Sequence, residues 1–153
     1  MAKITNKTIS EIKNVQEMLD FLEINMYEDE NIGILDNNNL YEYIKVSLQI
    51  LDFQTNYEMD GILTLYSDYN FHIAHIVESF EKTNNGEIAN LLKKIVGLYE
   101  INIKGKENAA GFKQEEILGE LEKKLMEMLD EKKYWKNVEE YIKENKEKTL
   151  LFL

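Results

Sequence analysis

The chain has 153 residues, of which 44% are hydrophobic and 31% charged, and its formal net charge at pH 7 is −11. This length and composition predict one folded domain rather than a disordered segment. The absence of cysteine excludes disulfides, thiolate metal sites and a cysteine nucleophile. All 18 basic residues are lysines. Because a nucleic-acid binder needs a cationic surface, this composition argues against direct binding of DNA or RNA.

The excess of negative charge lies in the first half of the sequence. Residues 1–81 contain 15 acids and 4 lysines, whereas residues 82–153 contain 14 of each, so the two halves carry −11 and 0. Complementary charges on two proteins attract them to each other and set the orientation in which they dock. The N-terminal half is therefore expected to meet a basic surface.

The first predicted helix begins at a capping box formed by Thr8 and Glu11 and continues to residue 26. Its apolar residues recur at spacings of three and four: Ile12, Val15, Leu19, Leu22 and Met26. Residues 28–39 are rich in Asp, Glu and Asn and predict an acidic loop that ends in an N-cap near Asn38 or Asn39. The loop does not fit a calcium-binding EF-hand, because acids and glycine do not fall at the required positions.

The middle of the chain predicts three more helices. Residues 40–53 have apolar side chains on more than one face, which is typical of a helix in the middle of a bundle. Residues 56–67 predict a turn and a short helix, and residues 70–83 a longer one. We expect Gly61 at the start of the short helix, where a missing Cβ permits a turn or close packing. The dipeptide Asn85-Gly86 predicts a left-handed stop between helices.

The C-terminal part predicts helices over residues 88–99, 117–129 and 134–142, with a loop over residues 102–112. The last five residues, TLLFL, are expected to dock on the fold or to contact a partner. No apolar run has the length of a membrane span and the N-terminus does not resemble a signal peptide, so a cytoplasmic protein without membrane contact is expected. The predicted fold is an all-α, single-domain helical bundle of about six or seven helices.

The sequence contains no P-loop, no nucleophile elbow and no dinucleotide-binding glycine motif, so it predicts a protein that is not an enzyme and uses no cofactor. One set of potential metal ligands stands out. Asp68, His72 and His75 have the spacing i, i+4 and i+7, and would share a face for zinc or iron if one helix contained all three. A helix cap near Asn70 would separate Asp68 from two ordinary surface histidines, and we favour this second interpretation.

The stretch NYEMDGILTLYSDYN, residues 56–70, resembles the hallmark of the DNA-mimic-protein-like family of small, all-helical bacterial domains. That hallmark is a double Asn and a double Gly followed by Phe, a Gln and an aromatic pair. The resemblance extends over about residues 40–99. The matching positions are Gly61 for the second glycine, Ile62 for the phenylalanine, Thr64 for the glutamine, Tyr66 for an aromatic and Asp68 for a terminal asparagine. The positions that depart from the hallmark are Glu58, Met59, Asp60 and Leu65.

The resemblance implies a helical fold and, from one branch of the family, an acidic decoy that occupies the DNA-binding surface of a transcription factor. Physical chemistry is consistent with such a role, because carboxylates at helical spacings lie about 5–6 Å apart and can imitate a row of phosphates. The expected partner is a basic protein that binds DNA or RNA. The acids expected to contact it are Glu17, Asp20, Glu28, Asp29, Glu30, Asp36, Glu42, Glu58, Asp60 and Asp68.

Two alternatives stay open at this point. The excess of acid can serve solubility alone, because net charge keeps a small protein dispersed. The protein can also be an assembly or immunity-type module that uses an apolar or aromatic surface, such as the C-terminal TLLFL. Truncation after Thr149 separates this second alternative from the decoy.

Overall fold

A computed structural model describes residues 2–66, 73–104 and 109–151. For residues 100–104 and 109–114 within these ranges it describes the backbone only. Within these ranges every regular element is a helix, which confirms the all-α prediction. The α-helices are α1 (Asn6–Ser10), α2 (Val15–Asn25), α3 (Glu42–Asp60), α4 (Ile73–Lys82), α5 (Gly86–Lys104), α6 (Ala109–Glu131) and α7 (Trp135–Leu151). Three short 3₁₀ helices complete the set: η1 (Asp29–Asn31), η2 (Ile34–Asp36) and η3 (Gly61–Tyr66).

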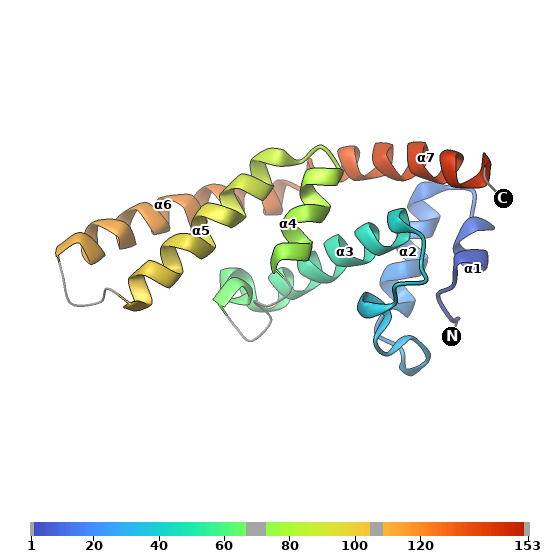
Figure 1. Ribbon diagram of the computed structural model, residues 1–153, viewed down its shortest axis with the longest axis horizontal. Coiled ribbons are helices and arrows are strands. Elements are labelled where there is room, and N and C mark those ends of the chain that lie inside the picture. The colour runs from blue at the N-terminus through green and yellow to red at the C-terminus, as the bar shows by residue number, and fades with distance from the viewer. Residues whose placement is uncertain (1, 67–72, 105–108, 152–153) are drawn as a thin grey trace.

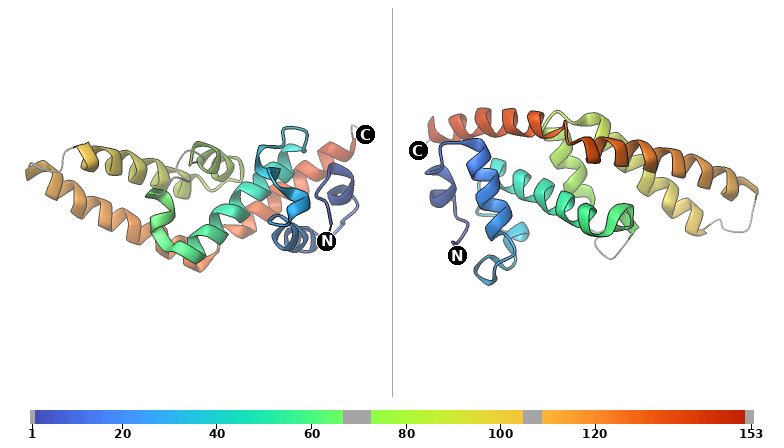
Figure 2. Two further views of the ribbon diagram at one scale, coloured as in Figure 1. Left: turned by 90° about the horizontal axis from the view of Figure 1, so that it is seen from below. Right: turned by 180° about the vertical axis from the view of Figure 1, so that it is seen from behind.

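The helices form an elongated molecule (Figure 1). Helices α5 and α6 lie side by side at one end, and α4 crosses between them and α3. Helices α1 and α2 and the end of α7 gather at the opposite end. Helices α6 and α7 follow one another along one edge of the molecule, as the further views also show (Figure 2). Segments from the two ends of the sequence therefore meet in space.

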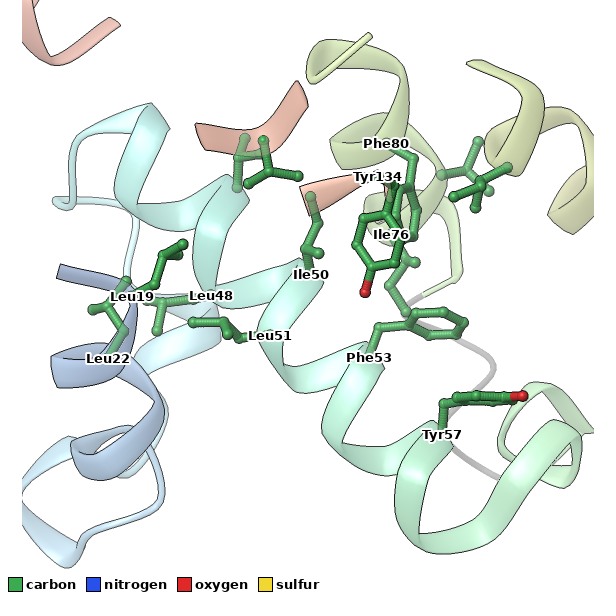
Figure 3. Packing of buried hydrophobic residues seen from close by; sticks show 14 of the residues in the cluster. Leu19, Leu22, Leu48, Ile50, Leu51, Phe53, Tyr57, Ile76, Phe80 and Tyr134 are labelled. Atoms are coloured by element: carbon green, nitrogen blue, oxygen red, sulfur yellow. The ribbon is translucent and has the colours of Figure 1, made fainter. Parts of the chain in front are cut away.

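Helix α3 is the centre of the core, as its apolar pattern predicted, but it continues to Asp60 rather than ending near residue 53. Leu19 and Leu22 of α2 lie beside Leu48 and Leu51 of α3, whereas Phe53 lies on the side of α4 (Figure 3). All these side chains belong to one cluster of buried hydrophobic residues that extends from Ile4 to Ile142.

The start of the chain differs from the sequence prediction. The single helix expected from Thr8 onward is divided into α1 and α2. The Thr5 hydroxyl accepts the backbone N–H of Thr8 at 3.1 Å, and the Asn14 side chain accepts that of Glu17 at 3.0 Å. The prediction of a capping box at Thr8 and Glu11 is therefore wrong. Two side-chain caps close together satisfy the first N–H groups of two separate helices, and the periodic apolar residues do not reveal this break.

The acidic segment after α2 is held by two asparagines. The buried Asn31 side chain accepts the N–H of Ile4 at 2.8 Å and donates to the carbonyls of Ala2 and Asn25. Asn6 binds the start of α3, since its side chain accepts the Tyr41 N–H at 2.7 Å and donates to the Asn39 carbonyl. The N-cap of α3 is consequently Tyr41, and not Asn38 or Asn39 as predicted.

Two helix ends contain a residue other than glycine with positive φ. Asn84, with φ of 60°, ends α4, and the next N–H, that of Asn85, binds the Phe80 carbonyl at 2.8 Å. This is a Schellman-type end, so the left-handed residue is Asn84 rather than a member of the predicted Asn85-Gly86 pair. Lys132, with φ of 58°, separates α6 from α7.

The C-terminal elements are longer than the sequence predicted. Helix α5 continues to Lys104 and α6 begins at Ala109, so helix replaces most of the loop expected over residues 102–112. The alanines at 109 and 110 are strong helix formers, which favours the early start of α6. Helix α7 includes Leu150 and Leu151, which are 48% and 82% exposed. The last two residues of TLLFL lie outside the described ranges.

Gly61 ends α3 and begins η3, with φ of 65° and ψ of −153°. Its N–H binds the Tyr57 carbonyl. Apart from the adjacent stretch of chain, no atom of the described residues lies within 4 Å of the position that a Cβ would occupy. Of the two reasons expected for this glycine, the turn is therefore the one that applies, and close packing is not, because only the backbone conformation demands a residue without a side chain.

Substituting alanine at two glycines is expected to change stability in opposite directions. Gly61→Ala forces an L-residue into a strained conformation and should lower the free energy of unfolding by about 1 kcal/mol or more. Gly97→Ala, in the exposed interior of α5 with no atom near its Cβ position, should raise it by up to about 1 kcal/mol. Urea unfolding followed by circular dichroism measures both. Equal destabilisation by the two substitutions would contradict this account of Gly61.

Candidate cation-binding cleft

Two acids of the predicted set line one cleft between α2, α3 and the junction of α6 with α7. The cleft has a volume of about 280 Å³. Asp20 comes from α2 and Glu58 from the last turns of α3. The structure adds two further acids, Glu23 of α2 and Glu139 of α7. The complete lining is Gln16, Leu19, Asp20, Glu23, Leu51, Gln54, Thr55, Glu58, Lys132, Trp135 and Glu139.

The acids converge because three helices cross here. Leu19 and Leu22 fix α2 on α3 through the core, which leaves Asp20 and Glu23 on the adjacent, exposed face. Residues three apart on a helix are neighbours on its surface. The left-handed Lys132 turns the chain from α6 into α7, so that the first turns of α7 pass the same place. The four carboxylates therefore come from three separate segments, of which α2 and α7 are more than a hundred residues apart in the sequence.

Glu58 is held at the edge of the cleft by two donors. Lys132 Nζ lies 2.7 Å from Glu58 Oε1, and Gln54 Nε2 donates to the same carboxylate at 3.2 Å. The hydrogen bond from Lys132 lowers the pKa of Glu58, and that from Gln54 acts in the same direction. In return, the same bond raises the pKa of Lys132. This pair is mutually neutralised, which leaves Asp20, Glu23 and Glu139 as the excess charge of the cleft.

An aromatic group forms part of the wall. Trp135, at the start of α7, is partly buried and its ring centroid lies 5.1 Å from that of Tyr134. The hydroxyl of the buried Tyr134 donates to Gln54 Oε1. Gln54 in turn binds Glu58, so a chain of hydrogen bonds fixes the orientation of the side chains around the tryptophan. Carboxylates beside an indole ring can hold a guanidinium or ammonium group by charge and by cation–π attraction.

The other predicted acids are not in this cleft. Glu17 is exposed in the first turn of α2. Asp60 is exposed at the end of α3, and Asp68 lies outside the described residues. Glu42, at the start of α3, forms an ion pair with Lys82 of α4. The remaining acids belong to the segment after α2: Glu28, Asp29, Glu30 and Asp36.

The metal-site candidate receives no support from the described residues. Asp68 and His72 lie outside them, and His75 is exposed on α4. Within residues 2–66, 73–104 and 109–151, no group of three or more histidine or acidic side chains is arranged to hold a metal ion. His75 instead shares a cleft between α3 and α4 with Lys45, Glu78 and Lys82.

Sequence reasoning missed Glu23, Glu139, Lys132 and Trp135. A local signal existed only for Glu23, which follows Asp20 by three residues on a predicted helix. Glu139 and Lys143 are four residues apart, and this local spacing indicates only a solvated Glu–Lys pair on a helix surface. Its place in the cleft depends on the packing of α7 against α2 and α3, and no local pattern contains that information.

Comparison of the chain with protein-family models, with curated proteins and with solved structures gives no match in any of the three. In the part of the chain that the structure describes, no helix is long and apolar enough to cross a membrane.

Proposed function

We propose that this protein is a non-enzymatic binding protein that covers the basic surface of a partner, and that the cleft receives an arginine or lysine side chain of that surface. The observation that carries the proposal is the convergence of Asp20, Glu23, Glu58 and Glu139 around Trp135, against the single cation Lys132. A guanidinium group suits this cleft best, because it can stack on an indole ring while it donates several hydrogen bonds to carboxylates.

The class of partner follows from the charge of the chain. Basic surfaces rich in arginine and lysine are typical of proteins that bind DNA or RNA. The N-terminal half of this chain carries all of the net charge of −11 and supplies α2 and α3 to the cleft. We therefore propose a nucleic-acid-binding protein as the partner and inhibition of its nucleic-acid binding as the effect, in the manner of a DNA mimic.

Neutralising three acids of the cleft should weaken binding of a short oligoarginine peptide about tenfold. The variant is Asp20→Asn/Glu23→Gln/Glu139→Gln, and isothermal titration calorimetry at low salt measures the affinity. Glu58 is kept, because its loss would also free Lys132. A tenfold change corresponds to about 1.4 kcal/mol, which is reasonable for charge-assisted contacts at a partly exposed site.

The matched control changes the net charge equally but elsewhere. Glu116, Glu120 and Glu127 are exposed on α6, so the variant Glu116→Gln/Glu120→Gln/Glu127→Gln should retain binding within about twofold. Equal losses in the two variants would show that only the overall charge attracts the peptide, and would overturn the assignment to the cleft. Binding should also weaken with added salt, since exposed charges are screened.

An assembly module that uses an apolar surface is the second candidate function. The observation that favours it is a set of exposed apolar side chains around the end of α2, where Ile24, Tyr27 and Ile32 are 71%, 56% and 82% exposed. Leu150 and Leu151 are exposed as well. Truncation after Thr149 discriminates between the two candidate functions. It should leave oligoarginine binding unchanged, whereas an adaptor that relies on the terminal leucines would lose its partner.

A further inference from the structure

A second cleft lies at the end of the molecule where α7 passes the connection between α1 and α2. These three segments meet there in all views (Figures 1 and 2). The volume of this cleft is about 430 Å³, within the range of small-molecule sites. Its lining residues are Ser10, Glu11, Lys13, Val15, Lys143, Lys146, Glu147 and Leu150. It shares no residue with the first cleft, lined by Asp20, Glu23, Glu58 and Glu139, which is called the acidic cleft from here on.

Lys146 is the unusual residue of this cleft. It is only 8% exposed, although lysine is almost never fully buried without a partner. Its ammonium group donates to the backbone carbonyl of Ile12. No ion pair with a carboxylate of the described residues compensates its charge. Burial of a charge without a counter-charge is unfavourable, and here it lowers the pKa of Lys146.

The surroundings of Lys146 indicate which ligand would compensate this charge. Lys13 and Lys143 bring two further ammonium groups to the same cleft, and Glu11 and Glu147 also line it. Val15 and Leu150 contribute apolar side chains. An anion beside Lys146 would pair with its charge, and an apolar chain attached to that anion would cover the exposed surface of Leu150 beside the largely buried Val15. Inorganic phosphate could pair with the ammonium but could not cover the apolar surface, and a neutral apolar molecule could do only the reverse.

We propose that this cleft binds a small carboxylic acid with an alkyl chain, whose carboxylate pairs with the Lys146 ammonium and whose chain lies against Val15 and Leu150. Lys13 and Lys143 add long-range attraction for the anion, which Glu11 and Glu147 partly oppose. The proposal is independent of the partner surface described above, because the two clefts share no side chain. A failure of one proposal therefore leaves the other untouched.

Octanoate, acetate and octanol are the probes that test it, because they separate the carboxylate from the alkyl chain. Calorimetric titration of the full chain at neutral pH should show at least tenfold tighter binding of octanoate than of either acetate or octanol. Lys146→Met should weaken octanoate binding at least tenfold. The control Lys148→Gln removes one positive charge from an exposed position of the same helix and should change the affinity less than twofold.

A spectroscopic measurement keeps the test independent of the variants. In protein with labelled lysine side chains, the ε-methylene signal of Lys146 should titrate at a higher pH with octanoate than without it, since a nearby carboxylate stabilises the charged ammonium. If Lys146 had only a structural role, the pH at which its signal titrates would not change on addition of octanoate. The proposal is overturned if Lys146→Met binds octanoate as tightly as the natural chain, or if octanol binds as tightly as octanoate.

Discussion

Replacing Phe80 by alanine will lower the free energy of unfolding by about 3–5 kcal/mol. Phe80 of α4 is 0% exposed and lies where α4 packs beside α3 and the turn before α7 (Figure 3). Its ring makes edge-on contacts with Phe53 of α3, at a centroid distance of 5.9 Å, and with Tyr134 before α7, at 5.4 Å. Removal of the ring therefore leaves a cavity against α3 and the turn before α7, and it also removes two favourable aromatic contacts.

Urea denaturation followed by circular dichroism measures this loss. Phe80→Leu keeps most of the side-chain volume and should cost clearly less than the alanine variant, which makes it the matched comparison. Ile117→Ala on α6, a position that is 42% exposed, should cost little. A loss below about 1 kcal/mol for Phe80→Ala would show that the aromatic cluster of Phe53, Phe80 and Tyr134 is not central to the stability of the core.

Lys146→Met will raise the free energy of unfolding by about 2 kcal/mol at neutral pH. Methionine has a similar length and no charge, and replacement even of a buried ion pair by apolar residues of similar volume is often neutral or stabilising by about 1–4 kcal/mol. The Ile12 carbonyl loses its donor in this variant, which offsets part of the gain. A clear destabilisation would mean that the bond to Ile12 contributes more than burial of the ammonium costs.

The same variant should change how stability depends on pH. Burial lowers the pKa of Lys146 in the folded state below its unfolded value of 10.5. The unfolded state thus binds more protons between these two pKa values, so the contribution of Lys146 to stability improves as the pH rises through that interval. The advantage of Lys146→Met should be largest below the folded pKa and should disappear towards pH 10.5.

The free energy of unfolding of Lys146→Met has to be compared with that of the natural chain at each pH. Burial raises the pKa of Tyr43 and of Tyr57 from 10.0 to about 12, and hydrogen bonding to Asp130 acts in the same direction at Tyr57. The stability that these neutral phenols contribute is complete below pH 10 and is lost as the pH rises towards 12. Because both proteins share this alkaline loss, their difference isolates Lys146. A difference that stays constant across the alkaline range would contradict the lowered pKa.

The acidity of the chain has unequal consequences along its surface. Glu42 and Glu58 are both in the predicted contact set, yet each is joined to a lysine that the sequence places at least forty residues away, at Lys82 and Lys132. These acids lose much of their attraction for a partner. Asp20 and Glu23 keep theirs because the face of α2 that carries them turns towards the cleft and away from the core. A count of charges along the sequence cannot separate these two groups.

The sequence by itself determined the all-helical class and most of the buried positions. Regular apolar spacing located α2 and α5 and identified α3 as the central helix, because burial of an apolar face dominates the energetics of helix packing. Helix ends were less predictable. Asn14, Tyr41 and Asn84 set three of them, and several neighbouring residues could have filled these positions equally well on local chemistry alone.

Only the tertiary structure decided which charged groups act together. The acidic cleft unites Asp20 of α2 with Glu139 of α7, and the second cleft places Lys146 of α7 against the carbonyl of Ile12. Each pair is separated by more than a hundred residues. Hydrophobic burial acts through a periodicity that a single segment contains, whereas electrostatic interactions depend on distance in space and on burial. The apolar periodicity can be seen in the sequence, whereas the proximity of the charged groups exists only after the helices have packed.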